Sequence, residues 1–157
     1  MAGSLEWVLL AYRIPREPST ERVTVWRKLR RLGVVQVVDG LVALPADART
    51  REQLEWIADE AVDAGGEATV WVARLGSRAM ERALAARMAA AVGDDYAATE
   101  AAAAAALSEP PATRSRTALR LGRELQRISR RDFFPPPQRE QARRAVTALS
   151  RSVEVTR

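Results

Sequence analysis

An Asp-Gly step at positions 39–40 constrains the fold of this chain more than any other feature of its sequence. The step separates two apolar runs, VVQVV (34–38) and LVALP (41–45). Asp-Gly between two such runs is a strong signal for a two-residue β-hairpin, and the pair favours a type I′ turn. The sequence therefore predicts two adjacent antiparallel strands joined at Asp39-Gly40.

A segment with helical periodicity precedes the hairpin. In STERVTVWRKLRRLG (19–33), the apolar side chains repeat at three- and four-residue steps, which places Trp26 on the apolar arc. We therefore interpret Trp26 as a core residue rather than as a platform for base stacking. Ser19 is the predicted N-cap of this helix, and Gly33 follows its basic last turn as the predicted stop.

A second helix and two further strands complete the pattern. The helix is predicted over 48–66, with Thr50 and Gln53 as a capping box. WVLLAY (7–12) and EATVWVARL (67–75) are predicted strands. The order is β-α-β-β-α-β, which is typical of an α+β ferredoxin-like fold with an antiparallel sheet. A winged helix is the alternative, but two helices that each lie between strands favour the ferredoxin-like arrangement.

Helices alone are predicted for the rest of the chain. They cover 77–92, 95–107 after a break at Gly93, an arginine-rich stretch up to 131 and a last helix over 138–153, with a linker at 108–114. The predicted organisation is a ferredoxin-like domain over 5–76 and a helical extension packed on it over 77–157.

Composition argues against most enzymatic chemistry. The sequence holds no cysteine and no histidine, which removes thiol nucleophiles, the usual general base and the commonest metal ligands. The phosphate-binding, dinucleotide, hydrolase and zinc-protease motifs are absent. We interpret Asp94-Asp95 as a helix N-cap rather than as a metal site. The sequence predicts a protein without catalytic residues, metal ligands or a cofactor.

Positive charge is gathered in the stretch RSRTALRLGRELQRISRR (114–131). On a helical wheel, one narrow sector holds Arg116, Arg120, Arg123, Arg127 and Arg130. These residues would extend over about 20 Å, at a rise of roughly 1.5 Å per residue. Such a ridge could follow DNA phosphates. It could equally be solvated, or it could pair with the acidic helix within 47–67, where surface ion pairs contribute only about 0–1 kcal/mol each.

The helix predicted over 19–33 forms a second basic patch. Arg27, Lys28 and Arg31 could contact phosphates or base edges if this helix enters a major groove. Arg22 falls on the apolar side, but it lies in the first turn, where it can reach solvent or an anion. A solvated charged face is the alternative here too.

Several stretches together resemble the N-terminal domain of ChrB-type chromate resistance proteins. They are WVLLAYRIP, PSTERVTVWRKLRRLG, DGLVALP, EATVWVARL and RRDFFP (130–135). The part from 5 to 76 is also similar to the middle domain of PaaX-type regulators. The ChrB resemblance implies a chromate-responsive regulator of an efflux operon, with DNA binding carried by Arg22, Arg27, Lys28, Arg30 and Arg31. The family's C-terminal chromate-resistance domain has no counterpart in the 157 residues.

The sequence thus favours a cytoplasmic, dimeric regulator that binds operator DNA through basic helix faces, without a membrane segment. An oxyanion effector is possible in chemical terms, since chromate is a sulfate-like dianion that an arginine pocket or a helix N-terminus can hold. The resemblance gives Asp132 a structural role, as a cap or a pairing partner, and gives Phe133 and Phe134 a role in packing. The alternative function is a non-enzymatic interaction module whose arginine ridge docks an acidic partner.

Overall fold

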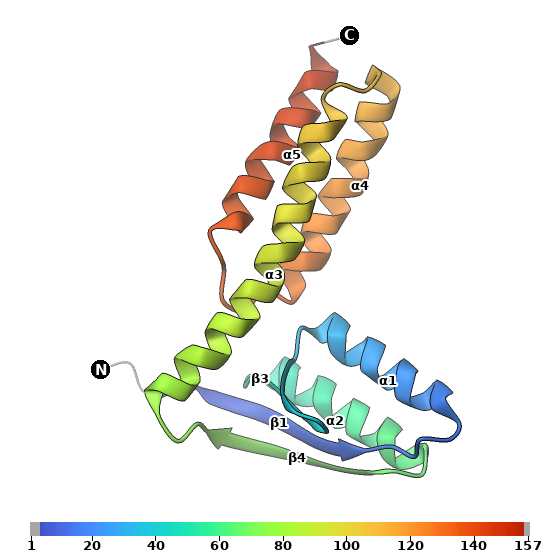
Figure 1. The fold of residues 1–157 in the computed structure, drawn as a ribbon, viewed down its shortest axis with the longest axis vertical. Coiled ribbons are helices and arrows are strands. Elements are labelled where there is room, and N and C mark those ends of the chain that lie inside the picture. Colours follow the sequence, from blue (N-terminus) through green and yellow to red (C-terminus); the bar gives the residue numbers. More distant parts are fainter. Residues whose placement is uncertain (1–3, 156–157) are drawn as a thin grey trace. The chain divides into compact units, whose positions relative to one another are not determined.

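A computed structural model describes residues 4–155 of the chain (Figure 1). The chain forms two compact units, which divide between Arg87 and Met88. A single helix, α3 (Arg78–Ala106), begins in the first unit and ends in the second. The domain limits expected from the sequence, 5–76 and 77–157, stay a prediction.

The first unit is a four-stranded antiparallel sheet with helices α1 and α2 on one face (Figure 1). The strand order is β2-β3-β1-β4, so β1 lies between β3 and β4. This arrangement confirms the ferredoxin-like α+β prediction. The elements are β1 (Glu6–Arg13), α1 (Ser19–Leu32), β2 (Val35–Val38), β3 (Leu41–Pro45), α2 (Ala48–Asp63) and β4 (Glu67–Arg74).

The apolar runs of the sequence supply the core of this unit. Trp7, Val8 and Leu10 of the central strand are fully buried, as are Leu44 of β3 and Leu54 of α2. A central strand is covered on both edges by neighbouring strands, which explains why β1 reads as a continuous apolar run rather than as an alternating one.

The hairpin turn lies where it was predicted, but its type is different. Gly40 has a φ of 77°, whereas no residue other than glycine has a positive φ in the described part of the chain. A type I′ turn needs positive φ at both central residues, so the type I′ assignment is wrong for Asp39. The register shifts between Gln36 and Val38, which indicates a β-bulge beside the turn.

Two predicted helix starts are also corrected. Pro18 occupies the N-cap position of α1, so Ser19 is the first helical residue and not the cap. At α2, the reciprocal capping box joins Asp47 and Thr50. Thr50 therefore closes the box as its third helical residue and does not open it. The predicted stop at Gly33 is confirmed, because this glycine adopts the left-handed conformation at the end of α1.

Helix α3 continues through Gly93, where a break was predicted. A Cβ atom at this position would lie 3.2 Å from the Gln138 Oε1 atom, so the glycine leaves room for the first residue of α5. The adjacent Asp94 and Asp95 lie inside the helix, which corrects their interpretation as an N-cap. Asp95 instead forms an ion pair of 2.9 Å with Arg131.

The second unit brings the C-terminal part of α3 together with α4 (Pro111–Arg130) and α5 (Gln138–Glu154). Helix α4 begins at Pro111, so the predicted linker over 108–114 is too long by four residues; proline suits the first helical position because its missing N–H has no partner there. Two groups of buried side chains join the three helices. They are Ala103, Ala106, Ala118, Leu121, Val146 and Leu149, and Val92, Tyr96, Ile128 and Ala142.

A buried polar contact accompanies this second core. The Tyr96 hydroxyl donates a hydrogen bond of 2.8 Å to the Asp132 Oδ2 atom. The Asp132 side chain is only 1% exposed, and the Arg139 guanidinium lies 4.0 Å from the same oxygen. Asp132 of the R-D-F-F element thus pairs within the unit, as its expected structural role requires. Burial, followed by the hydrogen bond from Asp132, raises the pKa of Tyr96 to about 12.

Candidate anion-binding surfaces

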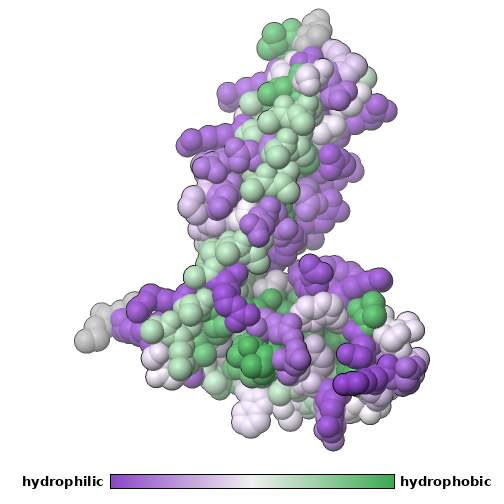
Figure 2. Space-filling view, viewed as in Figure 1, coloured by the Kyte–Doolittle hydropathy of each residue, from purple (hydrophilic) through white to green (hydrophobic). Residues whose placement is uncertain are grey.

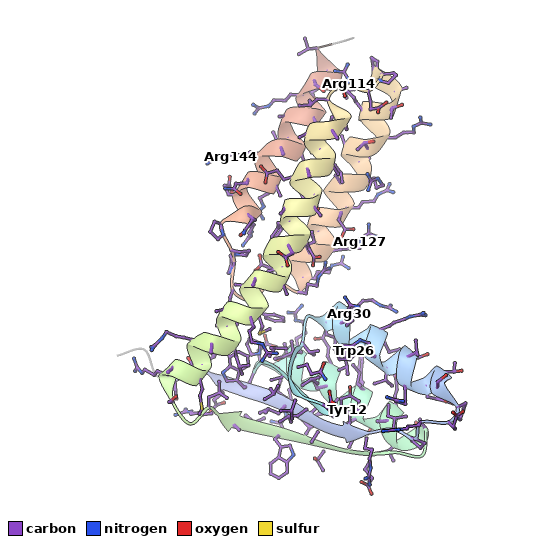
Figure 3. The ribbon with its side chains drawn as sticks, viewed as in Figure 1. Tyr12, Trp26, Arg30, Arg114, Arg127 and Arg144 are labelled. Carbon is purple, nitrogen blue, oxygen red and sulfur yellow. The ribbon has the colours of Figure 1, made fainter. Side chains whose placement is uncertain are left out.

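A groove lies beside α1 in the first unit and encloses about 1070 Å³. Four segments form its walls: the end of β1 with the loop that follows, one face of α1, the β2–β3 turn and the turn between α2 and β4. Tyr12 of β1 and Trp26 and Arg30 of α1 are among the lining residues that Figure 3 labels.

Positive charge exceeds negative charge along this groove. Its cationic lining residues are Arg13, Arg16, Arg22, Arg27 and Arg30. Its acidic lining residues are Asp39 and Glu67, and Glu67 forms an ion pair of 2.9 Å with Arg13. Within residues 4–155, the other four arginines have no carboxylate oxygen within 4.0 Å. Their charge is therefore available to an anion that enters the groove.

Two aromatic side chains line the same groove. Trp26 is only partly buried, which corrects its interpretation as a core residue. The apolar arc of α1 is wider than its contact with the core, which is made by Val25 and Leu29. Burial raises the pKa of Tyr12; the positive charge of Arg22 opposes this effect, and the negative charge of Asp39 adds to it. The Tyr12 hydroxyl consequently stays protonated at neutral pH and can donate a hydrogen bond.

Glycines let the backbone segments around the groove approach one another. A Cβ atom at Gly66 would overlap the main-chain carbonyl of Arg13, and one at Gly40 would lie 2.7 Å from the carbonyl oxygen of Tyr12. Both glycines line the groove. The close approach of backbone to backbone at these two places closes the wall beneath the aromatic side chains.

The cations predicted on α1 do not form one uniform set. Arg22, Arg27, Arg30 and Arg31 are exposed, and the first three line the groove. Lys28 differs from them, since its ammonium lies 2.7 Å from both carboxylate oxygens of Glu60 on α2. The sequence therefore located these charges on one helix, but Lys28 holds two helices together.

The arginine ridge on α4 is present as a row of exposed side chains. Arg116, Arg120, Arg123, Arg127 and Arg130 are all exposed, and Ala118, Leu121 and Ile128 on the opposite side are buried. Arg127 pairs at 2.9 Å with Glu124 of the same helix. In the part of the chain that the structure describes, the other four have no carboxylate within 4.0 Å. Figure 2 shows a mostly hydrophilic surface on this unit, crossed by a pale strip where alanine-rich α3 is exposed.

Sequence reasoning missed Tyr12, Arg16 and the groove itself. Arg13 to Pro18 was read only as a loop, although two of its residues are arginines that follow a strand directly. The signal that could have drawn attention to it is the gathering of Arg13, Arg16 and Arg22 around the start of a helix, because helix N-termini attract anions.

Other kinds of site find no support among the described residues. No group of three or more Asp or Glu side chains in residues 4–155 is placed to hold a metal ion. Over the same range, no helix combines the length and the apolar character that crossing a membrane requires.

Comparison with known proteins gives one match. No curated protein and no solved structure matches the chain. The family described as Protein ChrB, N-terminal, matches residues 22–109, which is more than half of the sequence and includes α1, the whole of the hairpin, α2, β4 and α3. The chain therefore belongs to the ChrB N-terminal family, a regulator-type and generally non-enzymatic family associated with chromate resistance.

Proposed function

We propose that this protein binds duplex DNA as a regulator of a chromate or oxyanion efflux operon. The observation that carries the proposal is the ridge on α4, where five exposed arginines follow one face of a helix and only Arg127 has a carboxylate partner among the described residues. Unpaired guanidinium groups release counterions from DNA phosphates when they bind, which gives affinity without the need for base contacts.

The exposed cations of α1 supply a second contact in this proposal. Arg22, Arg27, Arg30 and Arg31 are available, whereas the charge of Lys28 is offset by Glu60. Family membership supports a regulatory role. A homodimer that matches the two-fold symmetry of an operator, an oxyanion effector and a cytoplasmic location belong to the same proposal.

The ridge is tested by fluorescence anisotropy with a labelled 30-base-pair duplex from the region upstream of the coding sequence. We expect the combined change Arg120→Gln, Arg123→Gln and Arg130→Gln to weaken binding at least tenfold at low salt. The side chains are exposed, so the helical circular dichroism should not change. DNA binding that persists in this variant contradicts the proposal and favours an interaction module for an acidic protein.

A matched control comes from the same unit. Arg143→Gln combined with Arg151→Gln removes exposed positive charge from α5 but leaves the ridge intact. Retention of most of the affinity in this control, together with its loss in the ridge variant, assigns the effect to the position of the charges. Equal losses per charge in both variants would mean that DNA responds only to net charge, and that α4 is not the contact.

A further inference from the structure

We propose that the groove beside α1 binds a small organic anion that combines a planar ring with a phosphate group, as a mononucleotide does. The inference concerns the first unit alone and does not rest on DNA binding by the α4 ridge.

The size of the groove favours an organic ligand over a bare oxyanion. Ligand pockets in proteins commonly enclose about 300–1,000 Å³. The groove, at about 1070 Å³, lies at the top of this range and is far larger than a tetrahedral anion needs. A ligand with a ring and a charged group fills such a volume better than sulfate or free phosphate.

The aromatic side chains provide a place for the ring. Trp26 is partly exposed along the groove, and Tyr12 lines it from β1. An indole face that remains open to solvent is a surface on which a heterocycle can stack, with a contribution of about 1–3 kcal/mol per base. A half-exposed tryptophan on an otherwise charged helix face has no structural explanation in the core, which Val25 and Leu29 already fill.

The cationic side chains provide a place for the phosphate. Arg16 and Arg22 flank the start of α1, neither has a carboxylate within 4.0 Å among residues 4–155, and Ser19 at the first helical position lines the groove. No side chain caps this helix start, so its first N–H groups lack a side-chain acceptor. Arginine forks and free helix N–H groups together are a strong combination for phosphate.

The test is isothermal titration calorimetry on the full chain with three probes: adenosine monophosphate, adenosine and inorganic phosphate. We expect the monophosphate to bind at least tenfold more tightly than either of the other two, since only it engages both the ring site and the cationic site. Equal affinity for monophosphate and inorganic phosphate would overturn the assignment of a ring site. Absence of monophosphate binding would overturn the proposal as a whole.

Substitutions locate the binding within the molecule. Arg22→Gln should lower monophosphate affinity at least tenfold, and because Arg22 is exposed, it should leave the thermal midpoint unchanged. Trp26→Leu should lower the affinity as well, whereas Trp26→Phe should retain most of it through the remaining ring. Arg120→Gln, on α4, is the matched control and should bind normally. A loss of affinity in this control, or unchanged affinity in Arg22→Gln, contradicts a site in the groove.

Discussion

Among single residues, Tyr96 makes the clearest individual contribution to stability. Its hydroxyl donates the 2.8 Å hydrogen bond to Asp132, whose side chain is almost fully buried. Tyr96→Phe removes that donor and leaves a buried carboxylate less well satisfied. We expect a loss of about 1–3 kcal/mol in the free energy of unfolding at pH 7, the usual cost of an unsatisfied buried polar group. Urea unfolding followed by circular dichroism measures it.

The same residue predicts a dependence on pH. The pKa of Tyr96 is raised from 10.0 to about 12 in the folded protein, so folding favours the protonated hydroxyl. Its contribution is complete below pH 10 and is lost as the pH rises through 12. The difference in unfolding free energy between the wild type and Tyr96→Phe should therefore narrow from pH 10 to pH 12. A constant difference over this interval would show that the hydroxyl does not ionise in the folded state.

Two glycines give a matched pair of predictions with opposite signs. Gly66→Ala places a Cβ atom against the carbonyl of Arg13, and relief of that overlap must move backbone at the end of β1. We expect it to destabilise the protein by about 1–3 kcal/mol, as overpacking does. Gly122→Ala, within α4, meets no atom within 4 Å and should stabilise by up to about 1 kcal/mol through helix propensity. Thermal melts of both variants test the pair.

At the scale of elements, helix α1 carries two kinds of cation with different expected roles. Lys28→Ala breaks the contact with Glu60, and we expect a cost of at most about 1 kcal/mol because both side chains are about two-fifths exposed. DNA affinity should change little, since Glu60 already offsets this charge. Arg27→Gln combined with Arg31→Gln should lower DNA affinity several-fold without loss of stability. The reverse order of effects would mean that Lys28 is the residue that faces DNA.

Local signals predicted which elements form, but not how neighbouring elements modify them. The Asp39-Gly40 turn and the stop at Gly33 follow from sequence because each depends on a few adjacent residues. Gly93 was predicted wrongly because its role is set by Gln138, which lies far along the chain. The groove could not be predicted for the same reason, since it is made by segments that only the folded sheet brings together.

At the scale of the whole molecule, the net charge of +5 bears on how DNA binding responds to salt. The logarithm of the binding constant should fall linearly with the logarithm of the salt concentration, with a slope of about 0.9 for each phosphate neutralised. Removal of three ridge arginines should therefore reduce this slope by about 2–3. Titrations with the same duplex at four salt concentrations measure it. An unchanged slope would show that those arginines do not reach phosphates.

Lys28 is the single lysine of the sequence, and it stands between α1 and α2 with its ammonium on Glu60. An amine-specific label can therefore modify the folded chain at only one side chain, and its reaction there competes with this contact. The labelling rate of that amine, followed by peptide mapping, becomes a reporter of whether the two helices separate when the protein meets DNA or a nucleotide.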